Sequence, residues 1–416
     1  MTVLICFLVF VFLCTLLPAR AGHVRGFWSA AVVVLLSLCA MLVRYLGMDH
    51  VTADYTTFLS RWVQFFRDNG GFTALRYSVG NYNIPYLYFL AAFSYLPVYD
   101  LHLIKLLSVL FDLFLAWGAM ELTSCFTKNQ RSCLGVYFTV LLLPTVVLNS
   151  AYWGQCDSIY VAFALWSYVF ALRGRPWAAV SMIALSFAFK LQAVFFMPVF
   201  FLFLCGKKMK WYHLSAFPLT YLISVLPAVL LGRPLKDAVM LYFNQAGTVG
   251  SGANYNSPSL FAFLRDASPI AMNAGIIAAF ALILLVFAFV LLCKGQADDR
   301  VLLTVSVLFA VGIPFLLPHM HDRYFYGADV LTVVYAFVVS WRFAMPCLAS
   351  FASLLGYHAY LKGVYLLQMK YGAMALIAVL AALAVDLGCS LHACVLSAPK
   401  SRKPAPGEDL SDLGEL

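Results

Sequence analysis

Charged side chains are scarce in this sequence. Asp, Glu, Lys and Arg together make up 11% of its 416 residues, whereas a soluble globular protein carries about 25%. Hydrophobic residues account for 63%, and the mean hydropathy is +0.89. One or two buried cores could not hold so much apolar surface, so a large part of it must face lipid. The shortage of charge excludes a soluble globular protein and predicts an all-α, polytopic integral membrane protein.

Glutamate is nearly missing, since it occurs only at Glu121, Glu408 and Glu415. Acid–base chemistry on the outer side of the membrane would therefore fall to aspartate. Paired cysteine motifs are also missing. The 11 cysteines show neither CxxC pairs nor metal-ligand spacing, and we interpret them as small buried hydrophobic residues. The net charge of +9 arises from basic residues between apolar runs, which are typical orientation signals and predict no nucleic-acid partner.

Apolar runs recur along the whole chain, and several approach the length of a spanning helix. They predict about 12 or 13 crossings at about 20 residues each. The run 178–205 is expected to form two short passes, broken around Lys190. The first run has no positive charge before it, so we expect a retained helix and not a cleaved signal peptide. The runs lie at about 2–18, 27–47, 103–122, 133–150, 158–172, 178–205, 213–231, 274–293, 301–317, 324–341, 343–361 and 371–397.

Basic residues set the predicted orientation. The short loops and the tail that we assign to the cytoplasm contain 15 of the 27 Lys and Arg residues, as the positive-inside rule requires. The opposite, extracytoplasmic face then receives four polar segments. They are the first loop at 48–100, a corner at 153–157, the long loop 232–273 and a corner at 319–326.

The chain is expected to form one transmembrane domain over residues 1–397. The tail at 398–416 contains proline and is basic, then acidic, which predicts a disordered cytoplasmic segment. A loop as long as 232–273 is usually functional or carries short helices.

The first extracytoplasmic loop contains an amphipathic pattern over residues 54–68. Its apolar members recur at three- and four-residue spacing, which predicts a helix that lies beside the membrane surface. Gly70 and Gly71 follow as a C-terminal stop. Asp54 stands at the start, where it could simply cap the helix. The apolar positions are Tyr55, Phe58, Leu59, Trp62, Phe65 and Phe66.

The corner Trp153-Gly-Gln-Cys-Asp157 combines a stacking face, an amide and a carboxylate. This composition suits a sugar, which needs stacking beside hydrogen-bonding groups. A helix cap with an interfacial tryptophan explains the same residues equally well.

The corner His319-Met-His-Asp-Arg-Tyr-Phe-Tyr326 brings a guanidinium and two imidazoles together. Arginine is the fork-shaped partner of phosphate, so the pattern favours anion binding. A metal site is less favoured, because no fourth ligand lies nearby in the sequence, and a solvated loop without a role is a further alternative. Arg44 and Lys190 lie in or beside apolar runs, where a cation is a functional hypothesis unless it snorkels to the interface.

Taken together, these segments resemble the GT-C superfamily of membrane glycosyltransferases. Within it they are similar to the bacterial mannosyltransferase-like proteins related to the GPI mannosyltransferase Gpi18. The likeness spans roughly residues 27–341. The segments that carry it, in order, are Asp54-Tyr-Thr-Thr-Phe-Leu-Ser-Arg-Trp62, Asn81-Tyr-Asn-Ile-Pro-Tyr-Leu-Tyr88, Trp153-Gly-Gln-Cys-Asp157, Lys190-Leu-Gln192, Asn254-Tyr-Asn-Ser-Pro-Ser-Leu260 and His319-Met-His-Asp-Arg-Tyr-Phe-Tyr326.

The resemblance implies a hexosyltransferase, with mannose as one sugar, that uses a polyprenyl-phosphate sugar donor and inverts the anomeric centre. The acceptor would be a glycan, lipid or protein hydroxyl on the extracytoplasmic side. By position the catalytic base falls on Asp54. No cofactor is implied, and a divalent metal is not favoured. The expected donor-phosphate ligands are Arg323, His319, His321, Lys190 and Arg44, and the expected sugar or acceptor contacts are Trp153, Gln155, Asp157, Gln192, Tyr324 and Asn254.

One departure is the spacing of Asp49 and Asp54, because many GT-C members have paired acidic residues in this loop. Competing hypotheses are a lipid-linked polysaccharide ligase or polymerase, a lipid or solute transporter, and a non-catalytic scaffold. A transporter should place its polar residues near the midplane of internal repeats, and the sequence shows no repeat. The expected location is a bacterial plasma membrane, or the ER membrane in a eukaryote.

Overall fold

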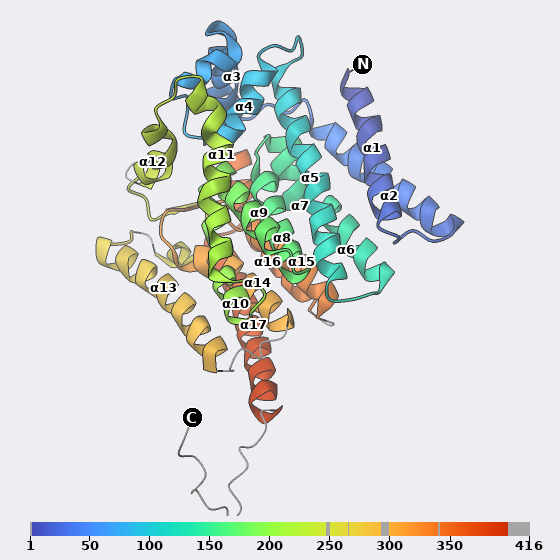
Figure 1. The fold of residues 1–416 in the computed structure, drawn as a ribbon, viewed down its shortest axis with the longest axis vertical. Coiled ribbons are helices and arrows are strands. Elements are labelled where there is room, and N and C mark those ends of the chain that lie inside the picture. The colour runs from blue at the N-terminus through green and yellow to red at the C-terminus, as the bar shows by residue number, and fades with distance from the viewer. Residues whose placement is uncertain (1, 247–249, 265, 293–298, 340–341, 398–416) are drawn as a thin grey trace, which may run out of the picture.

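The computed structural model describes residues 2–246, 250–264, 266–292, 299–339 and 342–397, and the predicted tail at 398–416 lies outside them. The described residues are almost entirely helical, with one short pair of strands (Figure 1). The elements are α1 (Thr2–Arg20), α2 (Phe27–Gly47), η1 (Tyr55–Leu59), α3 (Ser60–Asp68), η2 (Gly71–Arg76), α4 (Ile84–Phe93), α5 (Asp100–Ser124), α6 (Gln130–Leu142), α7 (Pro144–Val147), η3 (Leu148–Trp153), α8 (Asp157–Leu172), α9 (Pro176–Phe189), η4 (Leu191–Phe195), α10 (Val199–Cys205), η5 (Trp211–Ser215), α11 (Ala216–Leu230), α12 (Leu235–Ala246), β1 (Asn254–Tyr255), η6 (Leu260–Phe263), α13 (Pro269–Leu292), α14 (Asp299–Leu316), β2 (Met320–His321), α15 (Tyr326–Val338), α16 (Ala344–Lys362) and α17 (Met369–Ser397).

The prediction of an all-α polytopic membrane protein is confirmed. Among the described residues, 6 helices are long and apolar enough to cross a membrane, or 7 if the bent pair α6 and α7–η3 forms one span. This is fewer than the predicted 12 or 13 crossings. Most of the remaining apolar runs form helices of 10–17 residues, too short to span a hydrocarbon core of about 30 Å at 1.5 Å per residue. The run 343–361 forms α16, which has 19 residues but is not among the 6 candidate spans.

The run 178–205 is broken at the predicted position. Helix α9 ends at Phe189, and Lys190 takes an extended conformation with φ −154° and ψ 136°. A 3₁₀ turn, η4, and the short helix α10 follow. Lys190 therefore lies outside any helix, and it is buried in the protein with only 9% of the residue exposed.

The first loop forms the predicted amphipathic helix as η1 followed by α3. Figure 1 shows α3 and α4 together at one end of the bundle. Tyr55, Val63 and Phe66 are buried on one side, whereas Arg61 and Arg67 are exposed on the other. Gly70 adopts a left-handed conformation with φ 84°, as expected of the residue after a helix end.

The long loop 232–273 carries local structure. It contains α12, the turn η6 and strand β1. Strand β1 pairs in parallel with β2, so that Asn254 lies opposite Met320 and Tyr255 opposite His321. The pairing holds the long loop against the predicted phosphate corner, which is about 65 residues away in sequence.

A buried ion pair joins α2 to α5. The Arg44 guanidinium lies 2.8 Å from Asp112, and both side chains are fully buried. Arg44 also donates to the carbonyl oxygens of Ala40 and Leu141, at 3.0 and 2.8 Å. The Ser150 hydroxyl donates to the same Asp112 oxygen at 2.6 Å. Each charge is thus balanced inside the helix bundle, which is the condition under which buried charges are tolerated.

This pair generates a stability prediction. Arg44→Leu should lower the free energy of unfolding by about 3–5 kcal/mol, because it leaves the Asp112 carboxylate buried without its counter-charge. The double variant Arg44→Leu/Asp112→Leu should recover most of the loss. Unfolding of the detergent-solubilised protein would measure both effects. As a control, Arg67→Leu removes an ion pair whose arginine is 38% exposed and should change stability by about 1 kcal/mol or less. Equal losses in Arg44→Leu and Arg67→Leu would contradict the prediction.

Candidate functional site

Two π-helical turns hold the predicted base and the tryptophan corner. Asp54 directly precedes η1, and Trp153 is the last residue of η3. Gly154 then leaves the turn with φ 81°, a conformation that is readily available to glycine. Insertions of this kind into helices occur often at functional sites, because the extra residue changes the direction of neighbouring side chains.

The Asp54 carboxylate is held by three donors from two distant segments. Oδ2 accepts hydrogen bonds from Trp153 Nε1 at 2.8 Å and from Gln155 Nε2 at 2.6 Å. Oδ1 accepts one from the Tyr360 hydroxyl at 2.5 Å. The side chain makes no capping hydrogen bond, so the simple N-cap interpretation does not account for it. A carboxylate oxygen offers two lone pairs, and Oδ1 retains one for a further donor.

Aromatic rings enclose this carboxylate. Trp153 stacks on Tyr360 with ring centroids 4.5 Å apart and meets Tyr357 edge-on at 5.3 Å. Tyr82 donates to the amide oxygen of Gln155 at 3.1 Å. The amide is therefore oriented from both sides, with its NH₂ group directed at Asp54. Because Trp153 is fully buried between its neighbours, it fixes Asp54 in place and offers little surface for stacking on a sugar.

Arg323 is the cation at the centre of the cluster. Its guanidinium lies 3.9 Å from Asp54, 3.7 Å from Asp157 and 3.8 Å from Asp322. It also lies over the Trp153 ring, 5.3 Å from the centroid. The corner after α14 thus meets the first loop and the η3 corner at one point. The predicted proximity of Asp54 and Arg323 is present in the structure.

Asp157 is fully engaged within the protein. It forms an ion pair with Lys190 and accepts a hydrogen bond from Asn149 Nδ2 at 2.8 Å. Only 1% of its side chain is exposed. Asp157 therefore orients Lys190 and Arg323. The sequence predicts a contact between Asp157 and the sugar or acceptor, but the buried carboxylate is not free to make one.

Two adjoining cavities lie at this corner, and Arg323 lines the first of them. The first, of about 390 Å³, has the more polar lining of the two, which includes Tyr82, Lys190, His319 and Arg323. The second, of about 480 Å³, has a mainly apolar lining that includes Phe195, Ile276, Leu317 and Pro318. Five residues line both cavities: Asn81, Leu191, Gln192, His319 and Tyr324. A polar chamber and an apolar chamber thus share one wall.

Gln192 and Tyr324 stand in this shared wall. The Gln192 side-chain oxygen is buried and has no hydrogen-bond partner in the described residues. A buried, unsatisfied amide is unfavourable without a ligand or water, so the arrangement favours the predicted contact of Gln192 with a bound molecule.

The histidine corner is shaped by the long loop. His319 has φ 60°, a conformation that is uncommon for a residue with a Cβ. Its ring nitrogen Nδ1 lies 2.7 Å from the Gly252 carbonyl oxygen, and its backbone N–H donates to the Ala253 carbonyl oxygen at 2.7 Å. His321 stacks on Tyr255 at 4.7 Å. Burial, together with the nearby positive charge of Arg323, lowers the His321 pKa to about 4, so the ring is neutral at physiological pH.

Two predicted ligands lie elsewhere. Arg44 is enclosed by Asp112 and backbone carbonyls, which leaves no face for a donor phosphate. Asn254 uses both ends of its amide on Ser257, accepting from the backbone N–H at 2.7 Å and donating to the carbonyl at 2.8 Å. It lines a separate cavity of about 610 Å³. Asn254 therefore shapes the loop, and Arg44 stabilises the bundle.

Sequence reasoning missed Tyr360, and it named Asp322 without assigning it a role. Tyr360 lies on α16, in a segment without a recognisable motif, and nothing in the local sequence distinguishes it. Asp322 was visible between His321 and Arg323, yet its burial could not be seen. Among the described residues, no three or more His, Cys, Asp or Glu side chains are grouped so that they could hold a metal ion.

The model of glycosyltransferase family 87 matches residues 81–312, which is more than half of the chain. No curated protein matches the sequence. The match includes the corner at Trp153, together with Lys190 and Gln192. Asp54 and Arg323 lie outside the matched residues, so their roles depend on the geometry described above.

Asp322 generates a pH prediction. Burial raises the pKa of its carboxyl to about 7, against the opposing effect of Arg323, and the charges of Asp54 and Asp157 raise it further. The folded protein thus holds a proton that the unfolded chain releases near pH 4, so this group lowers the stability as the pH rises from about 4 to about 7. The melting temperature of Asp322→Asn, relative to that of wild type, should therefore rise as the pH increases from about 4 to about 7. The exposed Asp68→Asn should show no such trend, and a flat difference for Asp322→Asn would contradict the prediction.

Proposed function

The chain belongs to glycosyltransferase family 87, and from that premise we propose that it transfers a hexose from a polyprenyl-phosphate sugar to an acceptor hydroxyl, with inversion at the anomeric carbon. Mannose is the first sugar to test. The observation that carries the proposal is the position of Arg323. It lies 3.9 Å from Asp54 and lines a polar cavity that shares a wall with an apolar one.

Asp54 is the proposed general base. Its oxygen Oδ2 is occupied by Trp153 and Gln155, whereas Oδ1 has one donor and one remaining lone pair. An acceptor hydroxyl that donates to Oδ1 would lose its proton there as its oxygen bonds to C1 of the sugar. The three fixed donors keep the carboxylate in one orientation, which preorganises the base before substrate arrives.

The departing group in this proposal is the lipid phosphate. The bond between C1 and the phosphate oxygen breaks as the acceptor oxygen attacks, and the electron pair leaves with the phosphate. Arg323 and Lys190 line the polar cavity, where their positive charges would stabilise the growing negative charge. Asp157 holds both cations in place through its ion pairs. His319 stands in the wall of both cavities, with its Nδ1 directed at the Gly252 carbonyl oxygen.

The supply of carboxylates supports inversion. A double displacement needs one group as nucleophile and a second as acid–base catalyst. Asp157 is buried in contacts with Lys190 and Asn149, and Asp322 is 2% exposed. Of the three carboxylates around Arg323, Asp54 is the most exposed, at 16% of its side chain, which favours one direct displacement.

The pair of cavities supports a lipid-linked donor over a nucleotide sugar. The apolar chamber includes Ile276 on α13, a helix that stands at the outside of the bundle (Figure 1) and is long and apolar enough to span a membrane. A polyprenyl chain could therefore lie in the apolar chamber while its phosphate enters the polar one. We propose that the site faces the extracytoplasmic side, as the distribution of basic residues predicts.

Asp54→Asn tests the base. The substitution keeps the shape and hydrogen-bonding oxygen but removes the basic carboxylate, so kcat should fall by about 10²–10⁴-fold. The Kd for the donor should change by only a few fold, because the phosphate ligands remain. The matched control is Asp49→Asn in the same loop. Its side chain is 93% exposed and the variant should retain wild-type kcat. Equal activity of Asp54→Asn and wild type would exclude Asp54 as the base.

A donor panel tests the substrate class. Purified protein in detergent would be incubated with polyprenyl-phosphate hexoses and, separately, with nucleotide sugars that carry the same hexoses. Release of polyprenyl phosphate is expected only in the first set. Use of nucleotide sugars alone would contradict the lipid-linked donor. Movement of an unaltered lipid-linked sugar across a vesicle membrane, without bond cleavage, would instead indicate a transporter.

A further inference from the structure

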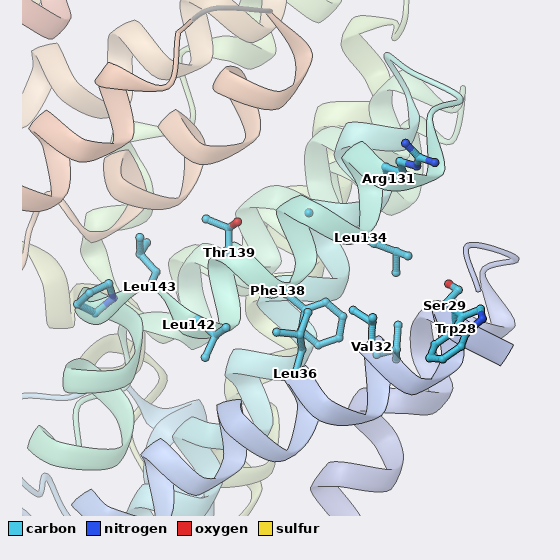
Figure 2. A pocket seen from close by; sticks show the side chains of 13 residues that line it. Trp28, Ser29, Val32, Leu36, Arg131, Leu134, Phe138, Thr139, Leu142 and Leu143 are labelled. Atoms are coloured by element: carbon cyan, nitrogen blue, oxygen red, sulfur yellow. The ribbon is translucent and has the colours of Figure 1, made fainter. Parts of the chain in front are cut away.

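An apolar groove lies apart from the candidate site. It has a volume of about 910 Å³ and runs between α2 and α6 (Figure 2). Its apolar wall consists of Val32 and Leu36 from one helix, and Leu134, Phe138 and Leu142 from the other. None of its lining residues is shared with the two cavities beside Arg323. The groove is therefore a separate surface and not an extension of the proposed donor site.

The two ends of the groove differ in polarity. Figure 2 shows Arg131, Trp28 and Ser29 at one end, and Leu142 and Leu143 at the other. Trp28 is 81% exposed, as is common for a tryptophan at a membrane–water interface. After the apolar end, the chain continues through α7 and η3 to Trp153. The apolar end is therefore closer in sequence to the candidate site than the polar end is.

Positive charge gathers at the polar end. Gln130 donates to the Gly22 carbonyl oxygen at 3.2 Å, which joins the loop before α2 to the loop before α6. Arg25, Lys128 and Arg131 in these segments are exposed. No ion pair involves any of the three among the described residues.

The nearby groups do not cancel this charge. Both α2 and α6 begin at this end, so the positive ends of their helix dipoles add to it. The carboxylate of Glu121, which influences His23 in the first of these loops, is already paired with Arg173.

The length of the groove indicates which kind of molecule could bind in it. Trp28 to Leu36 on α2 and Arg131 to Leu142 on α6 correspond to about 12 and 17 Å of helix. This is close to half of a hydrocarbon core of about 30 Å. An acyl chain from one leaflet has this reach, whereas a transmembrane helix of a second protein would run along the full span. The length thus favours a lipid over a second copy of the chain.

We propose that the groove between α2 and α6 binds a glycerophospholipid with a net negative headgroup. One acyl chain lies against Leu134 and Phe138, and the phosphate lies at Arg131, with Lys128 and Arg25 beside it. Basic residues at the mouth of an intramembrane groove are the physical basis of such headgroup selection. The lipid would be a bound structural ligand. The inference does not depend on the proposed glycosyl transfer.

Native mass spectrometry of the delipidated full-length protein tests this site. Phosphatidylglycerol and phosphatidylcholine with identical acyl chains would be titrated separately, and the Kd of the first bound lipid compared. Phosphatidylglycerol should bind more tightly by at least about fivefold, the effect expected of one basic residue near a lipid surface. Arg131→Gln should reduce that preference, and Arg131→Gln/Lys128→Gln should abolish it. Arg175→Gln removes an exposed cation from another loop and should leave the preference unchanged.

A second variant addresses the acyl chain. Leu36→Trp adds bulk to the wall of the groove and should weaken the binding of both lipids while the melting temperature without lipid remains close to that of wild type. Equal affinity of wild type for the two lipids would overturn the proposal. So would a dimer in detergent whose interface, located by cross-links between cysteines placed at Val32 and Leu134, occupies the groove.

Discussion

The arrangement of the candidate site depends on the interaction of one guanidinium with three carboxylates. Arg323 lies within 4 Å of Asp54, Asp157 and Asp322, which come from three segments of the chain. In a poorly hydrated interior such charges are tolerated only when they compensate one another. The first loop, the η3 corner and the corner after α14 must therefore meet at a single point, and this constraint brings Asp54 within 3.9 Å of a guanidinium that itself lines a cavity.

Irregular backbone supplies the geometry that regular helices could not. Asp54 and Trp153 stand at the edges of π-helical turns, Lys190 stands at a break between helices, and His319 has a positive φ. At each place the backbone departs from a continuous helix. The backbone N–H groups of Lys190 and His319 still donate within the protein, to the carbonyl oxygens of Ser186 and Ala253, as a membrane protein requires of irregular backbone. Strained or irregular segments persist where surrounding contacts fix them, as they do in many functional sites.

Arg44 and Arg323 are both arginines with little exposure, but their surroundings give them different roles. Arg44 has one carboxylate partner, two carbonyl acceptors and no adjoining cavity among those described. Arg323 is surrounded by more negative charge but keeps 18% of its side chain exposed and lines a cavity. The first arrangement satisfies a charge within the bundle. The second leaves part of a charge available to an incoming anion, because its partners lie at 3.7–3.9 Å and not at direct hydrogen-bonding distance.

The sequence by itself determined the membrane class, the amphipathic first loop, the break at Lys190 and the polar segments that would meet, because these follow from hydropathy, periodicity and local backbone preference. The spacing of residues could not reveal that Tyr360 from α16 reaches Asp54, or that Asp157 is enclosed by Lys190 and Asn149. Contacts between helices distant in sequence depend on how their side chains pack, and so does the remaining exposure of each charge. Only the tertiary structure decided which charged residues stabilise the bundle and which face a cavity.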